Sequence, residues 1–173
     1  MMDFLVRLEQ SGFSTWVRGS GSLFSYPLIL FLHTVGMAMV AGINVFVDLR
    51  ILGLAPDIRL SPMEKFYPFM WCGFGINAAT GVVLLAASAS TIAVSGVFWT
   101  KMALILLAII DLQFIRNRIF RDPLLDKRPV PTSNRFFALV SILLWAGAIT
   151  AGRLIAYVGT GAAENGITML WNR

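Results

Sequence analysis

The sequence predicts an all-α integral membrane protein, a four-helix bundle with an N-terminal interfacial amphipathic helix. The chain has 173 residues, of which 57% are hydrophobic and 13% are charged, and its mean hydropathy is +0.76. These values are too apolar for a soluble domain of this length. Long uncharged runs alternate with compact clusters of charged residues, which is typical of membrane-spanning helices and not of one globular core.

Residues 1–22 are predicted to form an amphipathic segment that lies in the membrane interface. Apolar and aromatic residues such as Phe4, Phe13 and Trp16 alternate there with polar and charged residues, as in helices that rest on a bilayer surface. We expect this helix to be broken near Gly12. Because no apolar run followed by a small-residue cleavage site is present, we do not expect a cleaved signal peptide.

Residues 23–158 are predicted to form the bundle. The first span begins with Pro27, which suits a helix start, and stays uncharged until Asp48. The second span is long enough to tilt or to end early in the Ser-rich sequence SASTIAVSG, and the Pro-containing loop DPLLDKRPVPTS separates the last two spans. The predicted spans cover residues 26–52, 63–95, 96–120 and 134–157, and residues 159–173 are expected to form a short tail on the outer side.

The distribution of Lys and Arg predicts the orientation of the chain. Nine of the 14 basic residues lie in or beside the connections after spans one and three, and five lie on the opposite side. Because cytoplasmic loops carry the excess of Lys and Arg, we expect a bacterial inner (cytoplasmic) membrane protein with both termini periplasmic. The same bias explains the net charge of +5 without nucleic acid. The expected partners are membrane lipid and either further copies of this chain or other subunits of a membrane complex.

His33, the single histidine, is the first candidate for a binding site. It lies in the apolar run LILFLHTVGMAMVAG, where a titratable ring is costly unless it meets a ligand, a partner or a wet cavity. Gly36 follows one turn later on the same face and leaves room for a flat ligand or for a close helix. Haem b would suit this position, with His33 as the ligand of the haem iron. A histidine hydrogen-bonded to a neighbouring helix is the alternative, and spacing alone does not choose between them.

Two cations are expected on the same side of the membrane as His33. Lys101 in the run VFWTKMALI and Arg153 in the run AITAGRLIAY are placed where they could meet haem propionates or other anionic groups. Snorkelling of either side chain toward the lipid headgroups is the alternative. A second axial ligand is poorly specified within one chain, so a histidine from a second chain or an open site is considered.

A candidate intramembrane polar network comprises Asp48, Arg50, Asp111 and Asn77. Asp111 interrupts the third span and should face the bundle interior. We expect it to pair with Arg50 or Arg116, or to accept a proton. Asn77 is expected either to pack in a seam of small residues or to hydrogen-bond across the bundle or to a ligand.

Other patterns give weaker information. Small residues on spans two and four, among them Gly73, Gly81 and Gly147, predict faces where helices pack closely. The only cysteine, Cys72, gives neither an intrachain disulfide nor a CxxC metal site. No HExxH, GxSxG, P-loop or Rossmann motif occurs, so hydrolase and nucleotide chemistry have no support.

Two stretches, LHTVGMAMVAGINVFVDLRILG in span one and FWTKMALILLAIIDLQFI in span three, carry a family resemblance. Over residues 24–157 the chain resembles small bacterial membrane proteins related to the HemJ-type protoporphyrinogen oxidases and the CopD copper-resistance proteins, in an uncharacterised branch. The resemblance implies a haem-b-associated membrane bundle, in which His33 matches the family histidine and Lys101 matches the lysine that begins the third helix. The chain departs from the HemJ pattern because Asp111 stands near the position of a further histidine, so porphyrinogen oxidation does not follow from the resemblance.

Three functions are consistent with these patterns. The leading hypothesis is a haem-b-binding membrane subunit involved in electron transfer, with His33 as axial ligand and Lys101 and Arg153 near the propionates. The alternative is a non-catalytic membrane anchor or assembly subunit of a larger complex. The third is a small-molecule or metal transporter that uses His33, Asp111 and Arg153 along a path. The sequence leaves open whether the protein is an enzyme.

Overall fold

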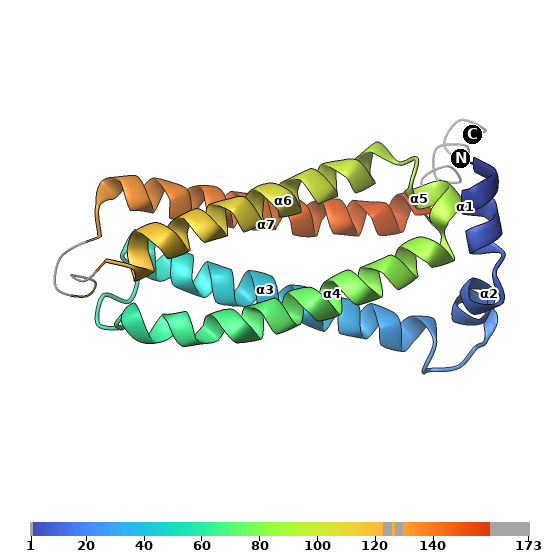
Figure 1. The fold of residues 1–173 in the computed structure, drawn as a ribbon, viewed down its shortest axis with the longest axis horizontal. Coiled ribbons are helices and arrows are strands. Elements are labelled where there is room, and N and C mark those ends of the chain that lie inside the picture. The colour runs from blue at the N-terminus through green and yellow to red at the C-terminus, as the bar shows by residue number, and fades with distance from the viewer. Residues whose placement is uncertain (1, 123–125, 127–129, 160–173) are drawn as a thin grey trace, which may run out of the picture.

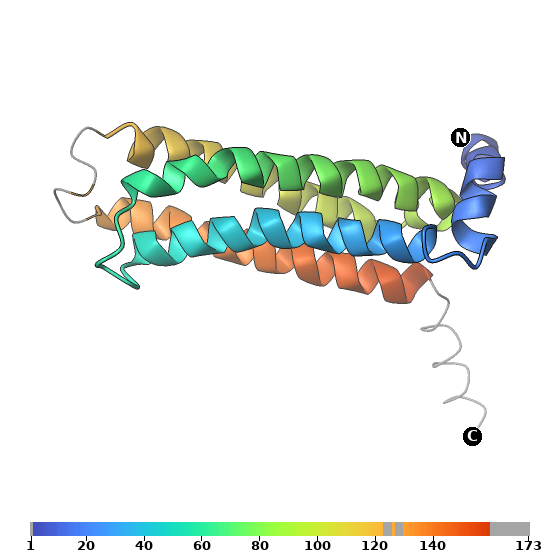
Figure 2. The same cartoon turned by 90° about the horizontal axis from the view of Figure 1, so that it is seen from below.

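The all-α prediction is confirmed by the computed structural model, which describes residues 2–122, 126 and 130–159. This part of the chain contains helices and no strands. Four long helices run side by side along the long axis, and two short N-terminal helices lie at one end of them (Figures 1 and 2). Most of the predicted tail, 160–173, lies outside the described residues.

The long helices follow the predicted spans closely. They are α3 (Tyr26–Leu52), α4 (Tyr67–Ala87), α6 (Gly96–Ile115) and α7 (Thr132–Gly159). The 3₁₀ helix η1 (Ser61–Phe66) leads into α4, and the π-helical segment η2 (Arg116–Phe120) continues α6. Four segments are therefore long and apolar enough to cross a membrane, Tyr26–Leu52, Ser61–Ala87, Gly96–Phe120 and Thr132–Ile155.

The second span ends earlier than residue 95, at the Ser-rich sequence. The main chain leaves the helical conformation at Ser88, with φ −141° and ψ 44°, and a single turn, α5 (Ala89–Ile92), follows. Both the amide and the hydroxyl of Ser90 donate to the carboxylate of Glu9, at 3.0 and 2.5 Å. The N-terminal segment is therefore bonded to the turn that follows the break in α4.

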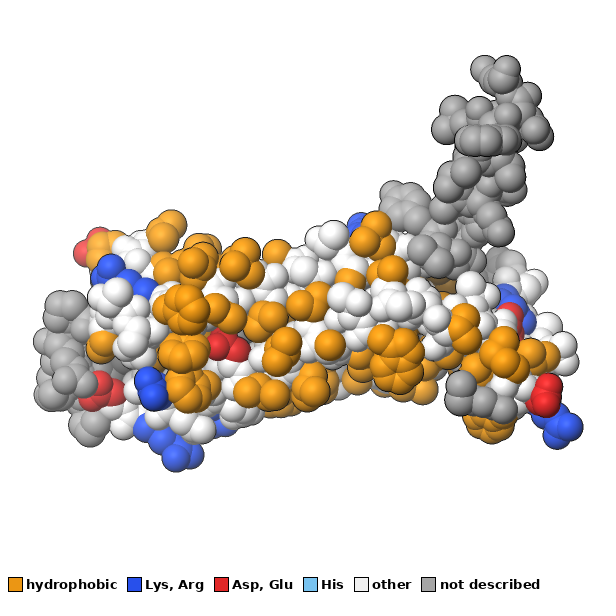
Figure 3. All heavy atoms as spheres, turned by 90° about the horizontal axis from the view of Figure 1, so that it is seen from above, with side chains coloured by type: hydrophobic (Ala, Val, Ile, Leu, Met, Phe, Trp, Pro, Cys, Tyr) orange, Lys and Arg blue, Asp and Glu red, His pale blue; other side chains and the backbone are white. Residues whose placement is uncertain are grey.

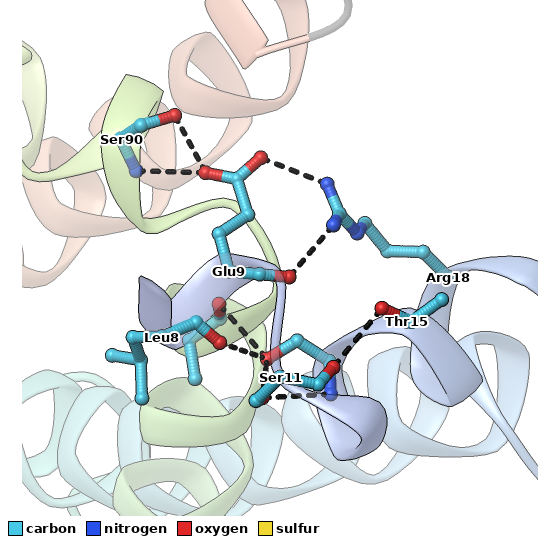
Figure 4. A network of polar contacts seen from close by, with 8 residues as sticks. Leu8, Glu9, Ser11, Thr15, Arg18 and Ser90 are labelled. Carbon is cyan, nitrogen blue, oxygen red and sulfur yellow. Dashed lines mark hydrogen bonds and ion pairs between the residues drawn. The ribbon is translucent and has the colours of Figure 1, made fainter. Parts of the chain in front are cut away.

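The predicted N-terminal segment forms two helices, α1 (Met2–Glu9) and α2 (Gly12–Gly19). The break lies at residues 10–11, beside the expected position, and the Ser11 hydroxyl caps α2 by accepting a hydrogen bond from the Ser14 amide at 3.3 Å. The Ser14 hydroxyl lies 3.2 Å from the Ala86 carbonyl oxygen. Figure 4 shows how Glu9 joins Ser90 to α2 as well. The two helices are therefore docked on the end of the bundle that carries α5.

Close backbone contact between α3 and α4 depends on two glycines. A Cβ atom on Gly36 would lie 2.7 Å from the carbonyl oxygen of Gly73, and one on Gly73 would lie 2.6 Å from the Cβ of Met39. Only glycine at both positions lets the two backbones approach this closely. On the other side of the bundle, Gly147 of α7 faces the side chain of Leu104 on α6. The predicted small-residue seams are thus helix contacts.

The outer surface of the bundle is apolar over most of its length. Figure 3 shows hydrophobic side chains along this face, with Lys, Arg, Asp and Glu gathered mainly near the two ends. Large side chains from each long helix are exposed there, for example Phe31, Val82, Leu106 and Leu143. A surface of this kind is solvated by lipid tails and not by water.

Candidate functional site

His33 projects from α3 toward α4, and its ring is held by two groups of that helix. Its Nδ1 atom lies 3.0 Å from the main-chain carbonyl oxygen of Asn77 and 3.1 Å from the hydroxyl oxygen of Thr80. A carbonyl oxygen can only accept a hydrogen bond, so Nδ1 carries the proton. In the neutral ring, Nε2 then keeps a free lone pair, which is the atom available to an electrophile or a metal.

Asn77 completes the link between the two helices. Its side-chain amide donates to the main-chain carbonyl oxygen of His33 at 2.8 Å, so each residue bonds the backbone of the other. One turn further along α4, a Cβ atom on Gly81 would lie 3.2 Å from Cε1 of His33. The glycine at this position therefore makes room for the imidazole ring, whose orientation the two helices fix.

Lys101 brings a cation to the same region from α6. Its side chain is half-buried and lies against α7, where a Cβ atom on Gly152 would be 3.6 Å from Cε and Nζ. The ammonium group is close enough to His33 for an electrostatic interaction. Of the cations predicted around the histidine, the structure thus brings Lys101 to it, whereas Arg153 is exposed on the outside of α7.

The space beside Gly36 is filled by α4. A Cβ atom there would also lie 2.8 Å from the amide nitrogen of Asn77, so of the two roles expected for Gly36, a flat ligand or a close helix, the structure shows the close helix. Met102 follows Lys101 but is 44% exposed on the outer surface. Any ligand of His33 must therefore be reached through the Nε2 edge of the ring and not across Gly36.

A second group of polar side chains is buried farther along the bundle, and every long helix contributes to it. Asp48 of α3 and Asp111 of α6 lie within electrostatic reach of each other. Tyr67 at the start of α4 and Ser141 of α7 are close to Asp48, and Trp145 of α7 packs in the same core as Tyr67. We refer to these five residues as the inner polar cluster.

Two members of the predicted polar network lie elsewhere. Asn77 is engaged with His33, as described above, and not with Asp48. Arg50 donates from Nη2 to the Pro56 carbonyl oxygen at 3.0 Å and from Nε to the carbonyl oxygen of Ile58. Arg50 lies in the last turn of α3, so its long side chain reaches loop carbonyl groups at the bundle end without being buried in the apolar interior.

The predicted pairing of Asp111 with Arg50 or Arg116 is not observed among the residues the structure describes. The Arg116 guanidinium lies 3.9 Å from the carboxylate of Glu64 and 5.2 Å from the ring centroid of Tyr67. Both arginines are satisfied near the surface, where charged groups keep part of their hydration. Asp111 therefore remains in the interior without a cationic partner.

Four residues of these two groups, Thr80, Tyr67, Ser141 and Trp145, were not predicted as site residues, and Gly81 was predicted only to pack helices. Thr80 and Gly81 follow Asn77 by three and four positions, so they share a helix face with it. Ser141 and Trp145 are four positions apart and also share a face. These spacings could have predicted both groups of neighbours. Nothing in the sequence placed the side chain of Tyr67 near Asp48.

Comparison with known proteins gives a family but no function. No curated protein and no solved structure was found to match the chain. A family model described as "Family of unknown function (DUF6644)" matches residues 18–158. The matched region includes His33, Lys101 and the whole inner polar cluster, and it leaves out α1 and most of α2. The chain therefore belongs to this family of unknown function, DUF6644.

Proposed function

We propose that this chain is a haem-b-binding subunit of the bacterial inner membrane that takes part in electron transfer, with His33 as the iron ligand. One observation carries the proposal, the hydrogen bond from Nδ1 of His33 to the Asn77 carbonyl oxygen. A bond of this kind fixes the tautomer and the ring orientation of metal-ligating histidines and raises the basicity of the other nitrogen. The resemblance to HemJ-type and CopD proteins supports the same reading.

The side chains around His33 suit the donor set that haem requires. Among the described residues no hydrogen bond reaches Nε2, so its lone pair is available. Lys101 on α6, beside α7, supplies a cation that could pair with a haem propionate. The chain contains a single histidine, so the second axial position would be open or filled by another copy of the chain.

Bound haem supplies one-electron redox chemistry, and the chain's own residues set its surroundings. Asn77 and Thr80 keep the His33 ring in one orientation, which limits the reorganisation that accompanies electron transfer. The helices around the ring are apolar, and a low-dielectric environment strengthens the interaction between Lys101 and any nearby anion. Gly81 has no side chain, which leaves space for the imidazole ring beside α4.

The proposed orientation follows from the ends of the bundle. The α3–α4 and α6–α7 connections lie at the end opposite α1 and α2 (Figure 1), and most Lys and Arg residues are in or beside those two connections. By the positive-inside rule that end faces the cytoplasm. His33 and Lys101 then lie in the periplasmic half of the membrane, and the aromatic residues of α1 and α2 rest in the outer interface.

Optical spectroscopy tests the haem proposal. Protein produced with ample haem and purified in detergent is compared, oxidised and dithionite-reduced, with His33→Ala and with Thr34→Ala. Thr34 is a matched control because it is exposed on the same helix and bonds only its own backbone, at Leu30. We expect a Soret band and reduced b-type bands in the wild type and in Thr34→Ala, their loss in His33→Ala, and their return when imidazole is added to that variant. A featureless wild-type spectrum contradicts the proposal.

A second candidate function is a non-catalytic anchor or assembly subunit. The contacts of His33 favour it if their role is to pack α3 against α4. The reciprocal bonds of His33 and Asn77, with the close approach of Gly36 to Gly73, join α3 to α4 without any ligand. If the wild-type protein shows no haem bands and His33→Ala leaves folding and assembly unaltered, the anchor is the better description.

A further inference from the structure

The inner polar cluster leaves one atom of each member without a hydrogen-bond partner among the described residues. These atoms are a carboxylate oxygen of Asp48 and of Asp111, the hydroxyl oxygens of Tyr67 and Ser141, and the indole nitrogen of Trp145. The exposed fractions of the five residues are 1%, 8%, 4%, 0% and 2%, and the unpartnered atoms themselves are buried. Ser141 is close enough to Asp48 to hydrogen-bond one of its carboxylate oxygens, but the second Asp48 oxygen, the Asp111 oxygen and the Tyr67 hydroxyl keep no partner among the described residues. Buried polar groups in proteins are almost always satisfied, by protein or by internal water, so these atoms indicate that the cluster holds a proton or water besides its own side chains.

We infer that the inner polar cluster is a proton-binding site, in which one of the two carboxyl groups, Asp48 or Asp111, carries a proton and internal water reaches the polar atoms that have no protein partner. This inference goes beyond the proposed function and does not depend on haem. Loading takes a proton from a hydronium ion at the membrane surface, leaving water, and converts one carboxylate to a carboxylic acid. Release reverses the step, and no oxidant or reductant is needed.

Charge balance is the first argument for a bound proton. Two ionised carboxylates in a low-dielectric interior repel each other and lose their hydration, and both costs are removed when one is protonated. The charged groups nearest the cluster do not neutralise it, because Arg116 at the end of α6 is shared with Glu64 of η1 and Arg50 is bonded to loop carbonyl groups.

The other titratable group within electrostatic reach of Asp48 is the phenol of Tyr67, on α4, which is neutral in its ordinary form. The part of α7 that packs here contributes Ser141 and Trp145, neither of which is charged. No element packed against the carboxyl pair therefore supplies a free cation from among its described residues.

The chemistry of the unpartnered groups favours a proton with water over a metal ion. The indole N–H of Trp145 can only donate a hydrogen bond, so it suits a carboxylate or a water molecule and would be repelled by a bound cation. The described residues contain no group of three or more His, Cys, Asp and Glu side chains that could hold a metal ion. Asp48 is within hydrogen-bonding reach of Ser141 and within electrostatic reach of Asp111 and Tyr67, while its Oδ2 atom has no hydrogen-bond partner among the described residues. A bridging water would satisfy that atom.

Infrared spectroscopy of the full chain in membranes tests the inference. The carbonyl stretch of a protonated carboxylic acid is recorded from acid to alkaline pH, in H2O and D2O, for the wild type and for Asp48→Asn, Asp111→Asn and Asp57→Asn. Asp57 is the matched control because it is an exposed carboxylate in the α3–α4 connection. We expect a deuterium-sensitive band that persists at neutral pH in the wild type and in Asp57→Asn, and that weakens or disappears at neutral pH in both Asp48→Asn and Asp111→Asn.

Two results would overturn the inference. One is the absence of a protonated carboxyl band at neutral pH in the wild type, a measurement that needs no variant and so does not depend on how the variants fold. The other is loss of the band on adding Na⁺ at constant pH, which would make the cluster a metal-cation site. The same spectra from His33→Ala separate this inference from the haem proposal, because the band is expected to persist in that variant.

Discussion

The Nδ1 atom of His33 lies 3.0 Å from the main-chain carbonyl oxygen of Asn77, so the backbone of a neighbouring helix orients the chain's single histidine. A main-chain acceptor cannot be removed by substitution of its side chain. A substitution at Asn77 would therefore leave this contact of His33 in place. The contact of the ring that a substitution can remove is the one with the hydroxyl of Thr80, 3.1 Å from Nδ1.

Thr80→Val tests that contact. Valine keeps the shape of threonine and removes the hydroxyl, so His33 retains the carbonyl bond and loses its second partner. Because groups that orient a metal-ligating histidine contribute to affinity, we expect haem affinity to fall about 10-fold, measured by haem titration of the apoprotein. Thr150→Val is the control, since Thr150 is exposed and bonds only the Ala146 carbonyl of its own helix. Equal affinities in the two variants would show that Thr80 does not orient the ligand.

Gly36→Ala tests the close contact of α3 with α4. The added methyl group would lie 2.7 Å from the Gly73 carbonyl oxygen and 2.8 Å from the Asn77 amide. Backbone atoms cannot move aside cheaply, so we expect a loss of about 1–3 kcal/mol in the free energy of unfolding, measured by denaturant titration in detergent. Gly42→Ala on the same helix, where no atom lies within 4 Å of the added carbon, should not be destabilised. A similar loss in both variants would mean that helix packing is not the cause.

Acid should release the N-terminal helices from the bundle. Hydrogen bonds from Ser90, and then the charge of Arg18, hold the pKa of Glu9 below its usual value of 4.5. Because the folded-state pKa is the lower one, the stabilisation is fully present above about pH 4.5 and is lost as pH falls through the folded-state value. Hydrogen exchange at Ser90, corrected for intrinsic rates, should therefore speed up at acid pH in the wild type.

Glu9→Gln is the variant that isolates this effect. It removes the titrating group, so exchange at Ser90 should be faster at neutral pH and no longer depend on acid. Asp3→Asn, an exposed carboxylate on the same helix, should behave as the wild type does. If Glu9→Gln retained the acid response, another group would be responsible for it.

Asp126 ties together the two connections at the opposite end of the bundle. Its carboxylate accepts hydrogen bonds from the amides of Leu60 at 2.7 Å and Ser61 at 3.0 Å, just before η1. Asp126→Ala leaves both amides without this acceptor, so we expect a loss of about 1 kcal/mol in the free energy of unfolding. Asp57→Ala in the same region is the control. Equal stability of the two variants would contradict a stabilising role for the hydrogen bonds of Asp126.

Cysteine labelling decides the orientation. The natural Cys72 is first replaced by Ser, and single cysteines are then introduced as Ser20→Cys at the α2 end and Asp57→Cys in the α3–α4 connection. With a membrane-impermeant maleimide and intact spheroplasts, we expect label at position 20 and none at position 57 until the membrane is permeabilised. The reverse pattern would place the excess of basic residues outside and contradict the periplasmic termini.

The positions of the spans could be predicted because they depend on a property that is local in the chain. A helix must be long and apolar enough to cross the hydrocarbon layer, so an uncharged run bounded by charged residues predicted 26–52, the bounds that α3 has. The expected early end of the second span in the Ser-rich sequence is confirmed, because α4 ends at Ala87. The contact of Ser90 with Glu9 beyond that end joins segments that are distant in the chain, so hydropathy gave no signal for it.

The sequence by itself determined the helical class and the four apolar spans, and it predicted that His33 and Lys101 lie in the same half of the bundle, where they are within electrostatic reach of each other. Only the tertiary structure decided how each helix is rotated about its axis, which turned Asn77 toward His33 and left Asp48 and Asp111 with no arginine partner among the described residues. The physical reason is that lipid is as apolar as the bundle interior, so hydropathy carries no information about which face of a helix is buried. The rotation of α3 against α4 is set by the steric fit of Gly36 and Gly73, which appears only when two helices touch.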